Sequence, residues 1–209
     1  MRMQCADGIT IRRGVEGDEE QIAELLSMAS GDMLSFILKG IDPSAAALQI
    51  YQEIISEKSG IFSLQNCIVA ERGGRSVAVA NAFPARMIES HLENVRLTER
   101  EEFLRYRIEH NDPSSFLLNN IAVAPEHRRL GIGRLLLEAV MTAAKQQSLS
   151  CVTLHVWADN LDATAFYRSF GFRLKRHIEI PWHCDLPHVG GSLFLQLDCV
   201  PRCLERLAV

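Results

Sequence analysis

The stretch that decides the fold is Phe116-Leu117-Leu118-Asn119-Asn120-Ile121-Ala122-Val123, followed by the turn Ala124-Pro125-Glu126-His127-Arg128-Arg129-Leu130-Gly131-Ile132-Gly133. The first segment is mostly apolar and stops before a proline, which is typical of a buried strand. After the turn, apolar residues recur every three or four positions, which predicts an amphipathic helix over 131–147. These residues are Ile132, Leu135, Leu136, Ala139, Val140 and Ala143. The chain is therefore expected to run from a strand through a glycine turn into a helix.

The turn has the features of a phosphate-binding site. The first N–H groups of a helix have no intrahelical acceptor, and the helix dipole adds partial positive charge there. Glycine at 131 and 133 lets the backbone approach a bulky diphosphate, and Arg128, Arg129 and Arg134 add full charges. A nucleotide-binding module could use a similar turn, but this one lacks the Gly-Lys-Ser/Thr ending of a P-loop.

A second strand and helix follow at 151–157 and 161–170. Val152, Leu154 and Val156 alternate with more polar residues, which predicts a strand. Asn160 can cap the next helix, and Gly171 stands where a helix end favours a left-handed residue. The apolar stripe of that helix is Ala163, Phe166, Tyr167 and Phe170.

These two segments together resemble the GCN5-related N-acetyltransferases (GNAT). Arg128-Arg129-Leu130-Gly131-Ile132-Gly133, directly after Ile121-Ala122-Val123, is similar to the family's acetyl-CoA pyrophosphate loop. Val156-Trp157-Ala158-Asp159-Asn160, with Tyr167 and Phe170-Gly171-Phe172, resembles the family's next strand and helix. The two motifs cover roughly residues 116–172.

The resemblance implies a set of residues that bind acetyl-CoA and one that takes part in catalysis. In the family, the residue matching Tyr167 lies beside the CoA sulfur and can protonate the departing thiolate. The alternative for Tyr167 is a core aromatic residue. Asn160 would contact the pantetheine arm in addition to capping its helix. The acetyl-CoA contacts implied are Ile121, Ala122, Val123, Arg128, Arg129, Leu130, Gly131, Ile132, Gly133, Arg134, Asn160 and Tyr167.

The resemblance also implies an α/β fold with a mixed, mostly antiparallel, twisted sheet flanked by helices. Strands 116–123 and 151–157 would be parallel neighbours that splay at their ends, with acetyl-CoA at the splay, and a right-handed crossover supports the parallel pairing. We expect one domain over residues 1–209, with a helical insertion at about 85–115 before the central strand. Further strands are predicted at 9–12, 67–71, 76–80, 174–180 and 192–198, and further helices at 18–30, 33–39, 42–58 and 99–110. Asp18 and the Thr98–Glu101 capping box mark two of the helix starts.

The function implied is direct transfer of an acetyl group from acetyl-CoA to a primary amine of a small molecule or peptide. A non-catalytic acyl-CoA-binding sensor is the alternative. The acidic residues of the 85–115 insertion favour a cationic acceptor. Asn119 and Asn120 could orient an amine or a water but cannot act as a base. The candidate bases, which the sequence does not rank, are Glu89, Glu93, His91, His155 and His183; a partly deprotonated amine would need no dedicated carboxylate.

The charge and composition of the chain limit the kinds of partner that we expect. A net charge of −4 argues against a nucleic-acid partner. No apolar run approaches the roughly 20 residues that span a bilayer, and the N-terminus lacks the apolar core of a signal peptide, so we expect a cytoplasmic protein without a membrane partner, as monomer or homodimer. The spacing of possible ligands matches no structural zinc pattern, so no metal is expected. Those ligands are His183, Cys184, His188, Cys199 and Cys203.

Overall fold

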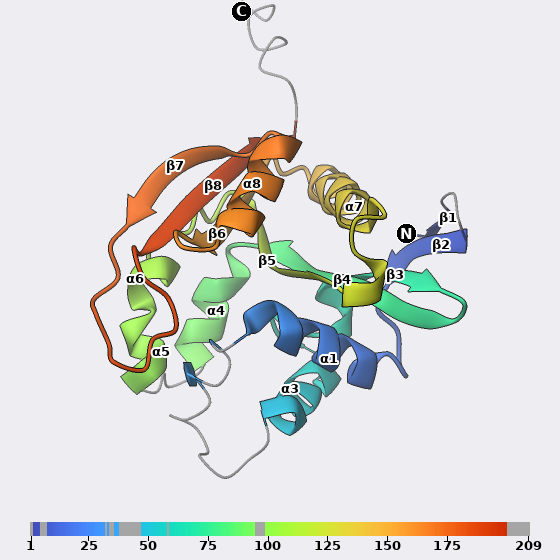
Figure 1. The fold of residues 1–209 in the computed structure, drawn as a ribbon, viewed down its shortest axis with the longest axis horizontal. Helices are drawn as coiled ribbons and strands as arrows, with labels where there is room; N and C mark the ends of the chain where they lie inside the picture. The colour runs from blue at the N-terminus through green and yellow to red at the C-terminus, as the bar shows by residue number, and fades with distance from the viewer. Residues whose placement is uncertain are drawn as a thin grey trace, which may run out of the picture.

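One eight-stranded sheet forms the centre of the protein. The computed structural model describes residues 2–4, 8–31, 33, 36–37, 47–57, 59–94 and 99–199. The strand order is β1-β2-β3-β4-β5-β6-β8-β7, and every described neighbouring pair is antiparallel except β5 with β6 (Figure 1). The strands are β1 (Arg2–Gln4), β2 (Ile9–Arg13), β3 (Cys67–Arg72), β4 (Arg75–Pro84), β5 (Phe116–Val123), β6 (Cys151–Trp157), β7 (Arg173–Ile178) and β8 (Ser192–Asp198). The predicted mixed, mostly antiparallel sheet is confirmed.

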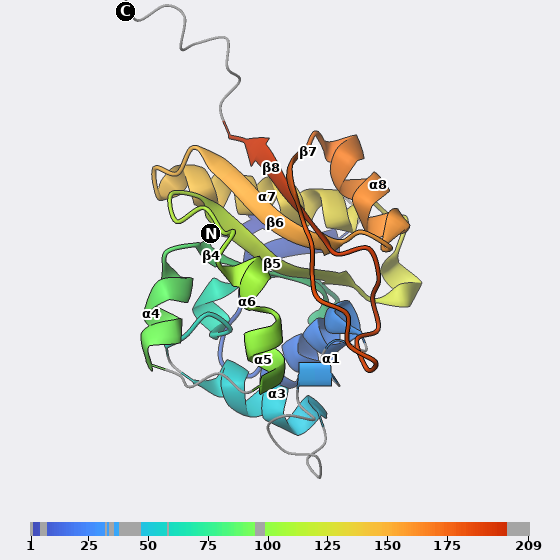
Figure 2. The same cartoon turned by 90° about the vertical axis from the view of Figure 1, so that its left-hand side faces the viewer.

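Helices cover both faces of this sheet. Figures 1 and 2 show α7 and α8 on one face and the remaining labelled helices on the other. The helices are α1 (Glu19–Ser30), α3 (Ala47–Ser56), α4 (Met87–Asn94), α5 (Glu99–Phe103), α6 (Arg105–Ile108), α7 (Ile132–Gln146) and α8 (Leu161–Phe170). Two short 3-10 turns lie at Leu64–Asn66 and Pro125–His127.

The alternation of side chains along each strand divides the interior into two main cores. Under α7 and α8, Leu118 and Leu154 pack with the apolar stripe of α7, which includes Leu136 and Val140. On the opposite face, Ile22 and Leu26 of α1 pack with strand and α3 residues. Burial on both faces explains why the central strands are so rich in apolar residues.

The 85–115 insertion forms its own layer on the face of α1. Its three described helices, α4, α5 and α6, lie between β4 and β5 in the chain. The predicted helix over 99–110 is interrupted at Leu104, so it becomes α5 and α6. Leu104 is buried against Phe36 and Trp157, which fixes this break against the end of β6.

Several helices and strands differ from the predicted elements in their presence or their boundaries. β1 and α4 were not predicted as separate elements, and β4 extends to Pro84, beyond the predicted end at 80. The Asp42-Pro43 helix start and Thr98 lie outside the described residues, as does most of 33–39. The described helices include none that is both long enough and apolar enough to cross a membrane.

Asp18 precedes α1, as predicted, but its side chain does not cap the helix. It accepts two hydrogen bonds from the Arg12 guanidinium, at 2.6 and 2.9 Å, and one from the N–H of Val15 at 2.8 Å. Glu71 binds the same guanidinium at 2.7 Å. Burial opposes the charge on Asp18, yet these donors and Ser76 hold the pKa of Asp18 below its usual value. The side chain thus ties β2, β3 and β4 together at the start of α1.

Candidate active site

The site begins where β5 and β6 separate. Their parallel pairing is confined to Phe116 with Val152, Leu117 with Thr153, and Leu118 with Leu154. A buried hydrogen bond of 2.6 Å between the hydroxyls of Ser115 and Thr153 joins the two strands at their amino ends. Beyond Leu118 and Leu154 no pairing between the two strands is found in the described chain. We call this gap the splay.

A bulge in β5 accompanies the separation. The register with β4 shifts so that Asn81 lies opposite Asn120 while Ala82 lies opposite Leu118, which leaves Asn119 as the extra residue. A bulge bends its strand and increases the local twist. β5 therefore keeps its partner β4 while it turns away from β6.

Backbone groups face into the splay from both strands. The N–H of Ala124 donates to Val77 on the β4 side, so by alternation Ile121 and Val123 direct their backbone groups away from β4. On β6, the N–H of Ala158 donates to Gly191 on the β8 side, so His155 and Trp157 face the splay in the same way. The splay is consequently lined by main-chain donors and acceptors that could bind an extended, amide-containing chain.

The turn at 128–134 closes one end of the splay. Arg129 and Gly131 adopt left-handed φ angles of 63° and 79°, and α7 starts immediately afterwards. Within the described residues, the five N–H groups from Arg129 to Gly133 donate no hydrogen bond. A row of free donors at the start of a 15-residue helix is a favourable site for a phosphate group.

Gly133 is needed for close packing in this turn. A Cβ added there would lie 3.2 Å from the Phe166 ring and 3.8 Å from a Val123 methyl group. The backbone of α7 thus approaches α8 and β5 more closely than a larger residue would allow. Gly131 has open space around it but needs its left-handed φ.

The arginines of the turn are exposed and differ in their contacts. Arg128 donates from Nε to the carbonyl of Val123 at 3.1 Å. Arg134 pairs with Glu138 at 3.2 Å, and its guanidinium lies 5.2 Å from the centre of the Phe170 ring. Exposed pairs of this kind contribute little to stability, so these cations remain available to a ligand.

Asn160 and Tyr167 both belong to the first helix after β6. Asn160 accepts the N–H of Ala163 at 3.1 Å, which confirms the predicted helix cap. Tyr167 is buried, with its ring against Phe166 and Phe172 at centroid distances of 5.5 and 5.6 Å. Its hydroxyl makes no hydrogen bond to any described residue, and burial raises its pKa above the usual value. The hydroxyl therefore stays protonated at neutral pH.

A chain of polar side chains lies at the bulge. Asn119 donates to Oδ1 of both Asn81 and Asn120, at 3.0 and 2.9 Å. Asn120 in turn donates to the Ser30 hydroxyl at 3.3 Å, which contacts the Tyr51 hydroxyl at 3.1 Å. The two asparagines singled out in the sequence thus belong to a network that links β4 and β5 to α1 and α3.

His155 lies beside the splay with both ring nitrogens engaged. Asn111 donates from its amide nitrogen to the carbonyl of Ile108, so its Oδ1 must accept from Nε2 of His155, at 3.2 Å. Nδ1 of His155 is 3.5 Å from the Ser192 hydroxyl. Burial, together with the nearby charge of Arg107, lowers the pKa of His155 well below its usual value. His155 is therefore neutral at physiological pH.

The other candidate bases are less well placed. Glu89 is exposed on α4, and the side chains of His91 and Glu93 lie outside the described residues. His183 is half-buried in the 181–191 loop, where its ring contacts Phe36 edge-on at 5.1 Å. Glu89 has no contact with a described residue that would position it at the splay.

The 181–191 loop covers the carboxyl end of β6. His188 stacks on Trp157 at 4.8 Å and pairs with Asp159 at 2.9 Å. The ligand atoms of His183, Cys184 and Asp185 lie within 4.8 Å of one another. Asp185, however, binds Arg100 at 2.6 Å and donates its N–H to His183 Nδ1 at 3.0 Å. His183 and Asp185 are thus engaged by protein contacts, and the expectation that no metal is used stands as a prediction.

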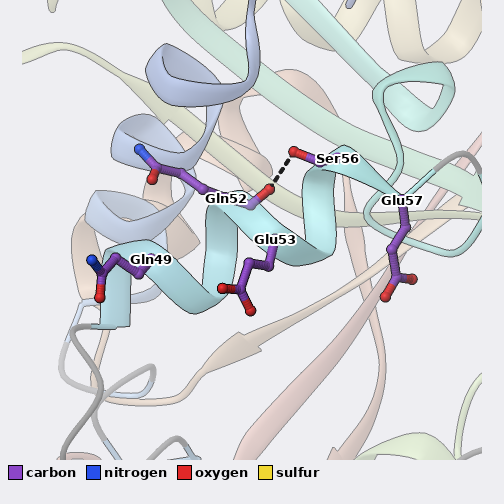
Figure 3. A pocket seen from close by; sticks show the side chains of 5 residues that line it. All are labelled: Gln49, Gln52, Glu53, Ser56 and Glu57. Carbon is purple, nitrogen blue, oxygen red and sulfur yellow. Dashed lines mark hydrogen bonds between the residues drawn. The ribbon is translucent and has the colours of Figure 1, made fainter.

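A shallow hollow lies on the outer surface of α3 (Figure 3). Its lining is polar and comes from α3 and the residue after it: Gln49, Gln52, Glu53, Ser56 and Glu57. No residue of β5, β6 or the 128–134 turn contributes to it. The hollow is thus distinct from the splay.

Two residues that shape the splay have no distinctive signal in the sequence. Asn81 is fully buried in β4 and donates to the carbonyl of Ile61 at 2.9 Å. A single asparagine in an apolar run does not predict this burial or this hydrogen bond. Arg107 reaches the splay from α6 through a 3.4 Å hydrogen bond to the carbonyl of His155. In the sequence it is one of several charged residues of the insertion.

Comparison with known proteins identifies the family. The model of the acetyltransferase (GNAT) family matches residues 43–172. The ribosomal protein bS18-alanine N-acetyltransferase of Escherichia coli strain K12 is 34% identical over 79 residues, 38% of this chain and 53% of that protein. The match thus spans about half the length of this curated relative.

Solved structures show the same fold. An N-acetyltransferase from Staphylococcus aureus Mu50 has a TM-score of 0.66 at 18% identity, over 90% of this chain and 98% of that one. A GNAT family acetyltransferase from Elizabethkingia anophelis, solved with acetyl-CoA bound, has a TM-score of 0.54 at 18% identity, over 92% and 99%. Since the family model matches well over half of its residues, the chain belongs to the GNAT family of acetyltransferases.

Proposed function

We propose that this protein transfers the acetyl group of acetyl-CoA directly to a primary amine of a small molecule or peptide. The observation that carries the proposal is the splay, whose unpaired backbone groups lead to the free N–H groups of the 128–134 turn. The family membership supports acetyl-CoA as the donor, and the relative named as a bS18-alanine N-acetyltransferase supports an amine as the acceptor.

The residues at the splay fit acetyl-CoA. The N–H groups of 129–133 would bind the diphosphate, with Arg128, Arg129 and Arg134 adding charge. Backbone groups of Ile121 and Val123 would hold the pantetheine arm as a neighbouring strand would. The close approach at Gly133 keeps this end of the site free of side-chain atoms.

Acetyl-CoA supplies an activated thioester. The protein therefore needs to position the amine, stabilise the negative charge on the thioester oxygen and allow the amine to lose its proton. Holding the two reactants together supplies much of the acceleration. Backbone N–H groups in the splay would stabilise negative charge that develops on the thioester oxygen. The amine would lose its proton through water, because His155 has both ring nitrogens engaged.

Incubation with acetyl-CoA and a panel of primary amines tests the proposal. We expect release of free thiol that depends on the amine, together with a product heavier by one acetyl group in mass spectrometry. A reaction without amine measures background hydrolysis. Tight acetyl-CoA binding with no thiol release across the panel would instead indicate a non-catalytic sensor.

Replacing Tyr167 with phenylalanine tests its role as the general acid. Acid assistance is typically worth about 10²–10⁴-fold, and we expect kcat to fall by about 10²-fold because a thiolate is a fairly good leaving group. The ring packing is retained and the lost hydroxyl has no described partner, so the thermal midpoint and acetyl-CoA affinity should stay unchanged. Full activity in the variant would show that Tyr167 is only a core residue.

A further inference from the structure

Arg107 holds a half-buried cation at the edge of the splay. Its NH2 group donates to the carbonyl of His155, the first β6 residue beyond the last pair with β5. That carbonyl faces the splay by the alternation described above. The guanidinium lies 4.6 Å from the centre of the Trp157 ring, which fixes its plane against the indole. The charge is therefore held at the edge of the splay, beside the point where β6 leaves β5.

Among the residues that the structure describes, this cation has no counter-ion. Within the described chain no carboxylate forms an ion pair with Arg107, and its Nε is inaccessible to solvent and has no acceptor. The other two arginines of α5 and α6 are paired at 2.6 Å each, Arg100 with Asp185 and Arg105 with Glu102. Arg107 thus differs from its neighbours on the same two helices in having no acid beside it.

A half-buried guanidinium with an inaccessible, unpartnered Nε is costly, so its retention calls for an explanation. Burial lowers the pKa of Arg107 to about 10, which still leaves the group charged at neutral pH. His155, whose carbonyl accepts from Arg107, is neutral and so adds no second positive charge beside it. With Nε inaccessible, the edge formed by the two terminal nitrogens remains, and this edge of a planar guanidinium can bind a carboxylate through two parallel hydrogen bonds without a second cation.

We propose that Arg107 binds the carboxylate of the acyl acceptor, so that the substrates are small amino carboxylates. This inference rests on the proposed acetyl transfer and names its acceptor class. Composition of the insertion favoured a cationic acceptor, but the charge that the insertion brings to the splay is positive. Its acid Glu89, by contrast, is exposed on α4. A carboxylate paired with Arg107 would place the substrate beside the splay with its amine free to reach the thioester.

Tryptophan emission gives a binding measurement that does not depend on turnover. The chain has two tryptophans, and Trp182 is 82% exposed, so Trp182→Phe leaves Trp157 as the reporter beside Arg107. Glycine, β-alanine and 4-aminobutyrate would be titrated at constant ionic strength, each against its primary amide. We expect a saturable change in emission for the acids and none for the amides.

Three variants of α6 separate recognition of the carboxylate from an effect of net charge. In the Trp182→Phe background, Arg107→Gln should weaken acid binding by about tenfold or more. Arg105→Gln removes the same charge from an exposed pair two residues away and should have no effect. Arg107→Lys keeps the charge without the planar fork and should bind with intermediate affinity. If the thermal midpoint shows that Arg107→Gln is unstable, Arg107→Lys replaces it as the test of carboxylate binding.

The outcomes distinguish this inference from the proposed function. Equal responses to acids and amides, or unchanged acid binding in Arg107→Gln, would overturn the carboxylate site. A loss of kcat in Arg107→Gln that is the same for acids and amides would overturn it too, and would indicate a role at the thioester oxygen. Acid binding that depends on Arg107, without thiol release from acetyl-CoA, would leave the carboxylate site standing and refute acetyl transfer to these amines.

Discussion

Gly133→Asp is expected to weaken acetyl-CoA binding by well over tenfold, a loss above about 1.4 kcal/mol. The substitution places a carboxylate among the free N–H groups of the turn, where we propose that the diphosphate binds. It also adds a Cβ 3.2 Å from the Phe166 ring, so the ring must shift by a few tenths of an ångström. Calorimetric titration with acetyl-CoA measures the effect directly.

Gly133→Asn is the matched control, because it adds nearly the same volume without the charge. If repulsion of the diphosphate dominates, Asn should bind acetyl-CoA clearly better than Asp, while both variants have similar thermal midpoints. Equal losses in the two would assign the effect to packing against Phe166. Wild-type affinity in a folded Gly133→Asp protein would contradict the proposed diphosphate site.

Asp18→Asn is expected to lower the free energy of unfolding by about 3 kcal/mol at neutral pH. The side chains of Arg12 and Asp18 are 14% and 8% exposed, so solvent screens their interaction weakly. Asparagine fills the same space but leaves Arg12 with Glu71 as its only carboxylate among the described residues. Denaturant unfolding of both proteins gives the difference, and the exposed Glu102 of the pair with Arg105 offers a control as Glu102→Gln.

The difference in stability between wild type and Asp18→Asn should decrease as the pH is lowered. Because the pKa of Asp18 is lowered in the folded state, its charge contributes stability above the unfolded pKa of about 3.9. That contribution is lost as the pH falls through the lower, folded value. Wild type and Asp18→Asn should therefore converge in stability on acidification. A difference that stays constant down to acid pH would show that the ion pair is not its cause.

Local patterns in the sequence predicted the elements that depend on neighbouring residues. The apolar stripe of α7 and the cap of α8 at Asn160 could both be predicted, since the residues that determine them lie within one or two helical turns. The same holds for the strands predicted at 67–71 and 76–80, since the turn between them contains Gly73 and Gly74, which both have positive φ angles. The splay itself was expected only through the family resemblance.

Contacts between distant segments could not be predicted in this way. Arg107 meets His155 across 48 residues of chain, and Arg12 meets Glu71 across 59. The break at Leu104 depends on packing against Phe36 and Trp157, which come from two other parts of the chain. Asp18 carried a valid capping pattern, but a nearby guanidinium competed successfully for its carboxylate. The tertiary structure therefore determines these contacts, and the local sequence does not.

The separation of β5 from β6 also gives the sheet two inner edges. Unpaired strand edges normally invite pairing with strands of other molecules. Here the edges lie inside the sheet, with α7 and α8 over one face and α1 over the other (Figure 2). A foreign strand projects side chains alternately to both faces and would collide with these helices, whereas a thin unbranched chain would not. The helices on both faces would thus disfavour pairing with a strand of another molecule, while the two inner edges stay open to a thin chain.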